Sequence, residues 1–383
     1  MATDVRGLLR EMAERGASDL YLTIDSPPVI RVEGVNHALD AAPLAPTEVE
    51  AFAYSLMTDR QRAVFEEQLE MNLGISSSQH GRFRINVFRQ RGAVGIVVRQ
   101  IKTAIPTIDD LGLPLILKDI VLTKRGLVLV TGATGSGKST TLAAMVDWRN
   151  TNSTGHIVTI EDPIEFMHPH RRCLVSQREI GFDTHSYATA LKNALRQAPD
   201  LILIGEVRDR ETMEAAITFA DTGHLCLATL HSNNANQALE RIMNFFPNDR
   251  HHEIFLQLSL NLRAIVSQRL VPGIDGKRVA ALEILVDTPY ARELIKQGQV
   301  DTVKEAMERS TQEGGQTFDQ ALFELYRQGL IDAEQALANA DSANNLRILM
   351  KNLDLRQTDR RMPGEASALR IQGVPSDQLL RRS

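Results

Sequence analysis

The pattern of apolar and polar positions changes near residue 115. Before that point, segments such as GRFRINVFRQRG and AVGIVVRQI alternate apolar and polar residues, which is typical of half-buried strands. Residues 18–34, punctuated by Ser26-Pro27-Pro28, predict a hairpin, and residues 47–71 predict two helices. We therefore expect an α+β domain over residues 1–101, followed by a linker over 102–114 that carries prolines and glycine.

From residue 115 onward, short apolar runs alternate with amphipathic helical stretches. The runs are GLVLVTG, HIVTIED, LILIGEV and HLCLATL, and the helical stretches include KSTTLAAMVDWRN and REIGFDTHSYATALKNALRQ. This alternation predicts an α/β fold, with a parallel sheet covered by helices. The chain is mostly helical in pattern after about residue 285. We expect residues 115–355 to form this second domain and the polar residues 356–383 to form a flexible tail.

Composition narrows the class of protein without naming a function. The 383 residues are 24% charged and 43% apolar, as in ordinary globular domains. A net charge of −5 argues against nucleic acid as the main partner. No apolar run approaches the ~18 residues of a membrane span, and the N-terminus lacks the apolar segment of a secretory signal. Cys173 and Cys226 are far apart, so we expect neither a disulfide framework nor a zinc site. Free cysteines fit a reducing compartment, and we therefore expect a cytoplasmic location.

The strongest chemical signal is TGATGSGKST at residues 131–140, directly after the apolar run GLVLV. It satisfies the phosphate-binding pattern G-x-x-x-x-G-K-[ST] with a strand before it and a helix after it. The glycines let backbone N–H groups converge on phosphates, Lys138 is expected to reach the β and γ phosphates, and Ser139 to hold Mg²⁺. The alternative is a chance glycine-rich turn, which this context disfavours. The expected ATP-binding residues are Gly132, Thr134, Gly135, Ser136, Gly137, Lys138, Ser139 and Thr140.

Acidic residues follow two of the other apolar runs. LILIGEVRD places Glu206 at the carboxyl end of a predicted strand, where it can orient or deprotonate an attacking water. HIVTIEDPIEF places Glu161, Asp162 and Glu165 at a similar position, and Pro163 ends that strand. Acids beside an anionic nucleotide need a cation between them, which favours a magnesium shell. Each acid could instead be a solvated loop residue.

Two histidines flank the last of the four apolar runs. TGHLCLATLHSNNA places His224 and His231 at the two ends of one predicted strand. A neutral histidine near a γ-phosphate can sense it through a hydrogen bond, whereas a lone strand histidine is more often structural. The residues by themselves leave both interpretations open.

Taken together, these segments resemble a known family. GATGSGKST, TIEDPIEF, LILIGEVRD and TGHLCLATLH resemble the Walker A, Asp box, atypical Walker B and His box of the bacterial secretion and type IV pilus ATPases. GASDLYL, GRFRINVFRQRGAVGIVVRQI and RGLVLVTGATGSGKSTTLAAM resemble its PilT/PilU retraction branch, and the similarity runs from about residue 7 to 350. It implies a PAS-like N-terminal domain, a RecA-like ATPase domain, and a hexamer in which each N-terminal domain packs on the next subunit's ATPase domain.

The resemblance also assigns roles by position. Lys138 and Ser139 would bind nucleotide and magnesium. Catalytic roles would fall to the Walker B, Asp box and His box residues: Glu206, Glu165, Glu161, His231 and His224. Arginines of the N-terminal domain could act on a neighbour's nucleotide, since a guanidinium stabilises phosphoryl-transfer charge, although strand arginines are often simply solvated. The candidates are Arg82, Arg84, Arg89, Arg91 and Arg99.

The implied function is an ATPase motor for type IV pilus retraction, the basis of twitching motility. It would act on an inner-membrane platform protein from the cytoplasmic side of the membrane. The chain departs from the retraction family at three places. Ala133 replaces a usual proline, which changes the stiffness of the loop and not its phosphate contacts. Glu293 in YARELIKQG stands where the retraction motif AIRNLIRE has asparagine, and the tail is extended; these two departures favour an accessory role beside a paralogous retraction ATPase.

Other functions remain as alternatives. A pilus-assembly or type II secretion ATPase usually carries a tetracysteine zinc insertion, which two cysteines cannot build. A small-molecule kinase would need an acceptor pocket and a lid. A nucleic-acid translocase is disfavoured by the acidic balance. For a non-catalytic nucleotide-gated assembly factor the discriminator is Glu206, because hydrolysis that survives Glu206→Gln would remove the catalytic role of that residue.

Overall fold

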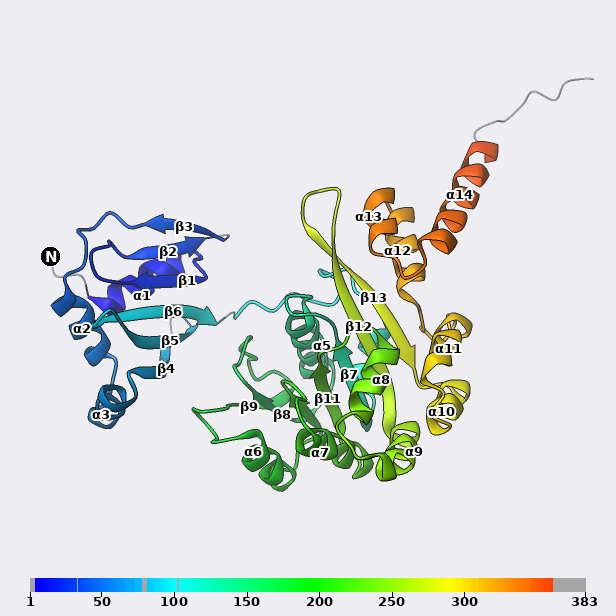
Figure 1. Cartoon of the computed structure of the whole chain (residues 1–383), viewed down its shortest axis with the longest axis horizontal. Helices are drawn as coiled ribbons and strands as arrows, with labels where there is room; N and C mark the ends of the chain where they lie inside the picture. The colour runs from blue at the N-terminus through cyan, green and yellow to red at the C-terminus, as the bar shows by residue number, and fades with distance from the viewer. Residues whose placement is uncertain (1–3, 33, 78–80, 102, 361–383) are drawn as a thin grey trace, which may run out of the picture.

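The computed structural model describes residues 4–32, 34–77, 81–101 and 103–360. It contains two separate β-sheets, joined by the segment that follows Ile101 (Figure 1). Among the described residues, no helix is both long and apolar enough to cross a bilayer. The tail expected over 356–383 lies outside the described residues from 361 onward. Its first five residues end helix α14 (Ala343–Arg360).

The N-terminal sheet is antiparallel and has six strands in the order β3-β2-β1-β6-β5-β4. Its strands are β1 (Asp19–Leu22), β2 (Val29–Val32), β3 (Val35–Ala38), β4 (Glu70–Ser77), β5 (Gly81–Gln90) and β6 (Ala93–Ile101). The predicted hairpin of β1 and β2 is confirmed. The two predicted helices are α2 (Pro46–Ser55) and α3 (Asp59–Gln68), although residues 70 and 71 already belong to β4.

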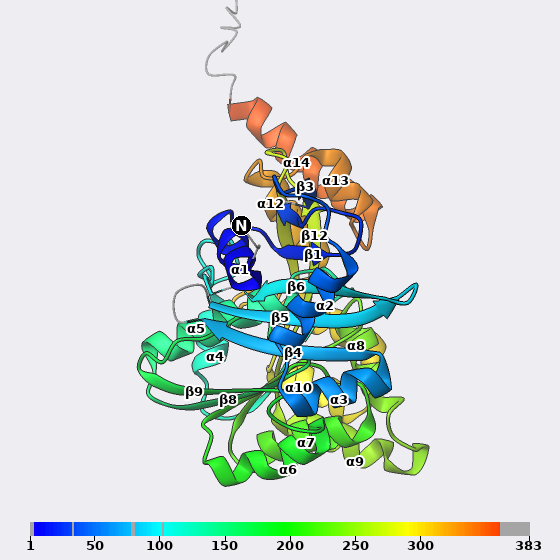
Figure 2. The ribbon, with the colours of Figure 1, turned by 90° about the vertical axis from the view of Figure 1, so that its left-hand side faces the viewer.

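Alternation along β5 explains why this sheet has two different faces. Phe83, Ile85 and Val87 are at most 1% exposed and pack with α1 (Val5–Glu14), α2 and α3. The residues between them, such as Arg82 and Arg84, point to the opposite face because successive side chains alternate across a strand. In both ribbon views α2 and α3 lie on the side away from the larger sheet (Figures 1 and 2).

The second sheet has seven strands in the order β13-β12-β7-β11-β10-β8-β9. All neighbouring pairs are parallel except β12 with β13. The four predicted runs form β7 (Gly126–Thr131), β8 (Gly155–Glu161), β10 (Leu201–Ile204) and β11 (Leu225–Leu230), so the parallel core is confirmed. The sequence had not indicated the flanking strands β9 (Cys173–Glu179), β12 (Leu262–Pro272) and β13 (Arg278–Val286).

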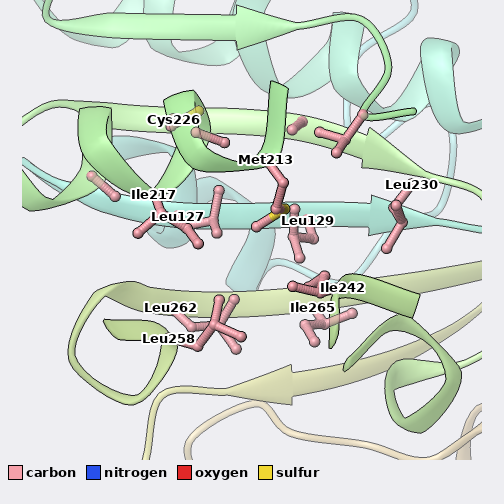
Figure 3. Close-up of a cluster of buried hydrophobic side chains, with 14 of the residues drawn as sticks. Leu127, Leu129, Met213, Ile217, Cys226, Leu230, Ile242, Leu258, Leu262 and Ile265 are labelled. Carbon is pink, nitrogen blue, oxygen red and sulfur yellow. The ribbon is translucent and has the colours of Figure 1, made fainter. Parts of the chain in front are cut away.

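Helices cover both faces of this sheet. One face packs on α4 (Ile116–Leu122) and α5 (Lys138–Asn152). The other packs on α6 (Tyr187–Ala194), α7 (Arg210–Asp221), α8 (Ala235–Met243) and α9 (His251–Asn261). Figure 3 shows Leu127 and Leu129 of β7 against Met213 and Ile217 of α7. Because every residue of β7, β10 and β11 is buried, these strands are continuous apolar runs without alternation.

One predicted helix begins later than expected. The stretch REIGFDTHSYATALKNALRQ starts with Arg178 and Glu179, which end β9, and its helix α6 begins only at Tyr187. Ser186 caps this helix by accepting a hydrogen bond from the backbone N–H of Thr189. Before the cap, the side chain of Asp183 accepts from the Glu179 N–H and closes a turn. The helix prediction over residues 178–186 was therefore wrong.

The C-terminal part is helical, as expected. It contains α10 (Pro289–Lys296), α11 (Val303–Arg309), α12 (Phe318–Arg327), α13 (Ala333–Ala338) and α14. Short 3₁₀ turns occur at η1 (Leu195–Gln197), η2 (Asn248–Arg250) and η3 (Val300–Thr302). Phe318, Leu322 and Leu346 pack with Val271 of β12, which places α12 and α14 beside the β12–β13 hairpin (Figure 1).

Candidate nucleotide site

The loop between β7 and α5 can form only with glycine at fixed positions. Gly132, Gly135 and Gly137 have φ angles of 150°, 79° and 88°, which side chains rarely adopt. A Cβ atom on Gly132 would lie 2.4 Å from Ser136 Oγ, and one on Gly137 would lie 2.7 Å from Gln268 Nε2. The sequence therefore folds this segment into a tight loop whose backbone can approach a phosphate closely.

Lys138 is held by the loop that it follows. Its Nζ donates to the carbonyl oxygens of Gly132 at 2.8 Å and Ala133 at 3.0 Å. Partial burial lowers the pKa of Lys138, because desolvation disfavours its charge. Among the described residues, the hydrogen bonds of Lys138 go to neutral carbonyls, and the nearby Glu206 favours its charged form. This cation is therefore suited to an anionic ligand.

A cavity of about 500 Å³ opens beside this loop. Most of the predicted site residues line it: Thr134, Gly135, Gly137, Lys138, Ser139, Thr140, Glu161, Glu165, Glu206 and His231. Ser136 is only 7% exposed and lies beneath the loop, and Gly132 lines a neighbouring cavity instead. The structure thus brings together residues from four separate strand ends.

Glu206 is held from two sides at the carboxyl end of β10. Arg208 forms a two-pronged contact with Glu206 Oε2, at 2.6 Å from both Nε and a terminal nitrogen. His231 Nε2 lies 3.0 Å from Glu206 Oε1. The other arm of Arg208 is 3.6 Å from Asp162. The sequence interpretation missed Arg208, although it stands within the quoted segment LILIGEVRD.

The acids after β8 occupy different environments. Glu161 Oε1 accepts a hydrogen bond from Thr159 Oγ1 at 2.6 Å and a longer one from Gln177 at 3.4 Å. Burial raises the pKa of Glu161 to about 7, since little water is left to solvate a carboxylate there. Glu165 lines the same cavity. These acids therefore form one wall of the site opposite the phosphate loop.

His224 lies at the other edge of the sheet. It precedes β11, and its Nδ1 is 3.2 Å from both Phe219 O and Thr222 Oγ1. His231 follows the same strand, whose six residues span about 20 Å. The two ends of a strand open on opposite edges of the sheet, so His224 does not reach the cavity of its own chain. Any catalytic part for His224 stays a prediction.

Comparisons with known proteins agree on one family. A family model described as type II/IV secretion system protein matches residues 2–361. The type IV pilus ATPase PilU of Pseudomonas aeruginosa is 57% identical over 345 residues, which cover 90% of this chain and 90% of that protein. The chain belongs to the type IV pilus retraction ATPase family.

Two further comparisons with this family support the fold. The retraction ATPase PilT of the same organism is 43% identical over 342 residues, covering 89% of this chain and 99% of that one. A crystal structure of the pilus retraction motor PilT with bound ADP has a TM-score of 0.83 and 42% identity, covering 89% and 98% of the two chains. The expected PAS-like N-terminal domain followed by a RecA-like ATPase domain is confirmed, and the protein is a nucleotide-binding ATPase.

Two buried polar residues of this retraction ATPase were missed by sequence reasoning. Gln268 of β12 donates to Ser136 O at 2.8 Å and accepts from Thr141 Oγ1 at 2.7 Å, so it holds the phosphate loop from behind. Glu283 of β13 is 2% exposed, and burial raises its pKa. Its Oε1 accepts from the backbone N–H of Ala235 at 2.7 Å. The signal available was a polar interruption of an apolar run: one acid, Glu283, in AALEILV and three polar residues that include Gln268 in AIVSQRLV.

The five candidate arginines separate into two groups. Arg84 and Arg99 are cross-strand partners and share a face with Arg82, which lies 3.7 Å from Glu179 of β9. Arg99 also pairs with the buried Asp19 at 2.9 Å. Arg89 points to the helix-covered face, where it contacts Glu66 and the ring of Phe65, and Arg91 lies in the turn after β5. We call the face opposite α2 and α3 the open face of the N-terminal sheet, because those helices do not cover it. It carries Arg82, Arg84 and Arg99, and at Arg82 it contacts β9 of the same chain.

Proposed function

We propose that this protein is the ATP-hydrolysing subunit of a homo-hexameric ring that retracts type IV pili as an accessory to a paralogous retraction ATPase. The single observation that carries the proposal is the placement of Glu206. It lies between His231 and Arg208, on the same cavity as Lys138 and Ser139. Similarity to PilU over 90% of the chain supports the accessory assignment.

The chain offers a suitable place for Mg²⁺ with ATP. No group of three or more His, Cys, Asp and Glu side chains could hold a metal ion within the described ranges. This fits a P-loop site, where the nucleotide itself supplies most of the ligands and Ser139 adds a hydroxyl. Residues Gly132–Thr140 would hold the phosphates, and Glu161 and Glu165 would bind the outer waters of the ion. Bound magnesium would neutralise the charge that develops on the phosphates.

In the hydrolysis step, a water oxygen bonds to the γ-phosphorus as the bond to the bridging oxygen of ADP breaks. Glu206 accepts the proton that this water loses, because its carboxylate is the base that the cavity presents at the end of β10. His231, 3.0 Å from Glu206 Oε1, fixes the direction of that carboxylate. Lys138 would exchange the carbonyls of Gly132 and Ala133 for the β and γ phosphates.

The remaining groups would come from a neighbouring subunit. The face with Arg82, Arg84 and Arg99 would approach the nucleotide of the next subunit and stabilise the transferring phosphoryl group. In this proposal residues 1–101 move as one domain on the linker 102–114 relative to residues 115–355. Loss of the γ-phosphate would shift that domain and act on an inner-membrane platform protein from the cytoplasmic side.

Helix α10 carries the departure that favours an accessory role. Glu293 lies on its exposed side and accepts a hydrogen bond from Gln297 at 2.6 Å, while Leu294 and Ile295 are buried. A carboxylate thus replaces the expected amide on the surface. On the buried side, Leu294 and Ile295 match the motif, whereas Ala291 stands where the motif has isoleucine. The exposed carboxylate would change contact with the platform protein.

The first test is ATP turnover measured against mass in solution. The protein and its Glu206→Gln variant are compared with Asp221→Asn, an exposed acid beyond the opposite edge of the sheet. We expect turnover only in the hexamer, a loss of about 100-fold or more in Glu206→Gln, and normal turnover in Asp221→Asn. Turnover by a monomer, or a Glu206→Gln variant with normal turnover, would contradict the mechanism.

The accessory role needs a cellular test. Pilus retraction is measured in a host strain that lacks its own accessory ATPase, with and without the second retraction ATPase. We expect this protein to raise retraction force only when the second ATPase is present. Full retraction by this protein alone would overturn the accessory assignment while leaving the ATPase mechanism intact.

A further inference from the structure

A second cavity of about 290 Å³ adjoins the phosphate loop. It is lined by residues 132–133 of the loop, residues 231–233 after β11, and Gln237 and Arg241 of α8. Its volume far exceeds the ~10–15 Å³ that one water molecule requires. The cavity is therefore able to hold a small solvated ion.

The two cavities differ in charge. The first is lined by four acids, Glu161, Asp162, Glu165 and Glu206, as a magnesium nucleotide requires. The second has no acid among its lining residues, all of which belong to the described part of the chain. Its one cation is Arg241, an exposed residue for which the described residues show no ion pair or hydrogen bond. A cavity with an unpaired guanidinium and no carboxylate favours an anion.

Hydrogen bonds next to the second cavity leave side-chain donors available to a ligand there. The side-chain oxygen of Gln237 accepts from the backbone N–H of Asn233 at 3.2 Å, which leaves its NH₂ group as a donor. The carbonyl oxygen of Ala133 accepts from the backbone N–H of Ser136 at 3.2 Å, a bond that does not involve Lys138. This acceptor at the cavity is thus engaged, whereas the donors of Gln237 and Arg241 are available.

His231 connects the two cavities. It lines both, and its Nε2 lies 3.0 Å from Glu206 Oε1. The phosphate group that separates from ATP in the first cavity would form next to Glu206. His231 and loop residues 132–133 line the second cavity together with Arg241.

We propose that the second cavity binds the inorganic phosphate released by hydrolysis, with Arg241 as its cation. The inference rests on the ATPase mechanism proposed above. Once the bond between the γ-phosphorus and the bridging oxygen has broken, the phosphate passes His231 into this cavity while ADP stays on the loop. Phosphate consequently leaves before ADP, and by a separate opening.

The test uses inhibition of ATP turnover by added inorganic phosphate. We expect Arg241→Gln to raise the phosphate inhibition constant by about tenfold, the usual loss for a hydrogen bond to a charged group. The KM for ATP stays unchanged, since Arg241 does not contact ATP. The matched control is Arg196→Gln. Arg196 is an exposed arginine of η1 that lines neither cavity, so this variant should change neither the phosphate inhibition constant nor the KM for ATP.

A direct binding measurement separates this inference from the hydrolysis mechanism. Inorganic phosphate is titrated by calorimetry into the ADP-loaded hexamer of the wild type, Arg241→Gln and Arg241→Lys. We expect about tenfold weaker binding in Arg241→Gln and partial recovery in Arg241→Lys, which keeps the charge but not the planar fork. Phosphate binding that depends on Arg241 in a protein without turnover would support this site and overturn the hydrolysis mechanism alone.

Two results would overturn the phosphate site. A raised KM for ATP in Arg241→Gln would place Arg241 on the γ-phosphate of ATP itself. Phosphate binding and inhibition equal to those of wild type would make Arg241 a solvated surface residue.

Discussion

The two sheets of this protein present polar side chains in opposite ways. In the seven-stranded sheet, β7, β10 and β11 are buried along their whole length, and polar residues such as Glu206 and His231 appear where strands end. In the N-terminal sheet, charged residues such as Arg84 and Arg99 lie along the middle of strands, on an open face. The polar side chains of the first sheet gather at the edge where its strands end, and the charged side chains of the second sheet lie across one face.

Topology explains this difference. A parallel sheet needs helical crossovers, which cover both of its faces and leave only the strand ends for a ligand. An antiparallel sheet is joined by tight turns and needs a cover on one face only. The edge of the first sheet is therefore suited to hold a small ligand, and the face of the second to meet another protein surface.

The largest expected effect is at the edge of the parallel sheet. We expect Lys138→Ala to lower ATP turnover by about 100-fold or more, since it removes the cation that the loop offers to the phosphates. Lys192→Ala, an exposed lysine of α6, serves as the control and keeps normal turnover. ATP turnover and nucleotide affinity are measured for both variants and for the wild type. A fully active Lys138→Ala variant would show that the edge is not the reacting site.

A smaller effect, on stability and on ADP binding, is expected at Gln268 of β12, which holds the phosphate loop in place. Gln268→Leu removes both hydrogen bonds that hold the phosphate loop and leaves the buried Thr141 hydroxyl and Ser136 carbonyl without this partner. We expect a loss of about 2–6 kcal/mol in the free energy of unfolding, at about 1–3 kcal/mol for each of the two unsatisfied groups. ADP should also bind more weakly. Denaturant unfolding measures the loss of stability, and ADP titration measures the affinity for ADP. An unchanged ADP affinity would limit Gln268 to a stabilising role.

A pH effect of intermediate size is expected from His168, which lines the nucleotide cavity and is 8% exposed. Burial lowers its pKa from 6.5 to about 4. Between these values the unfolded chain binds the additional proton, so stability falls as the pH falls through this window. From pH 7 to pH 5 the loss from this group is about 2 kcal/mol.

The variant His168→Gln isolates this contribution. It cannot titrate, so its unfolding free energy should fall less between pH 7 and pH 5 than that of the wild type, by about 2 kcal/mol. His185→Gln, at an exposed histidine, should follow the wild type. Equal pH dependence of His168→Gln and wild type would show that His168 is solvated in the folded protein.

The smallest effect is expected on the open face of the N-terminal sheet. Arg84→Ala should change the free energy of unfolding by no more than about 1 kcal/mol, because Arg84 is partly exposed and its charged neighbour Glu179 is also close to Arg82. Ile85→Ala, its neighbour on the buried face, should cost about 2–5 kcal/mol. Both are measured by denaturant unfolding. A similar loss for the two variants would remove the distinction between an open face and a core face.

How much could be predicted depended on how local each feature is. The strands β7, β8, β10 and β11 were found because a strand buried on both faces is an apolar run. β12 and β13 were missed because Gln268 and Glu283 interrupt their apolar pattern. The helix expected from residue 178 was wrong because pairing of β9 with β8 and the Ser186 cap override helical periodicity.

The same limit applies to the site. The strand, the glycine loop and the helix that follows it were predicted, since these features are neighbours in the sequence. His231 was predicted together with His224, and only the direction of β11 separates them. Arg208 and Arg241 were not found, because a surface arginine has no pattern that distinguishes it from a solvated one.

The sequence by itself determined the phosphate loop, the order of the acidic and histidine segments, and the family. These depend on backbone geometry within a few residues, where the identity of each side chain decides which conformations are allowed. Tertiary structure decided which charged groups meet. Gln268 holds a loop 132 residues away, and Arg241 of α8 lines one cavity with residues 132–133 of that loop. Such contacts follow from the order of strands in the sheet, which spacing along the chain does not encode.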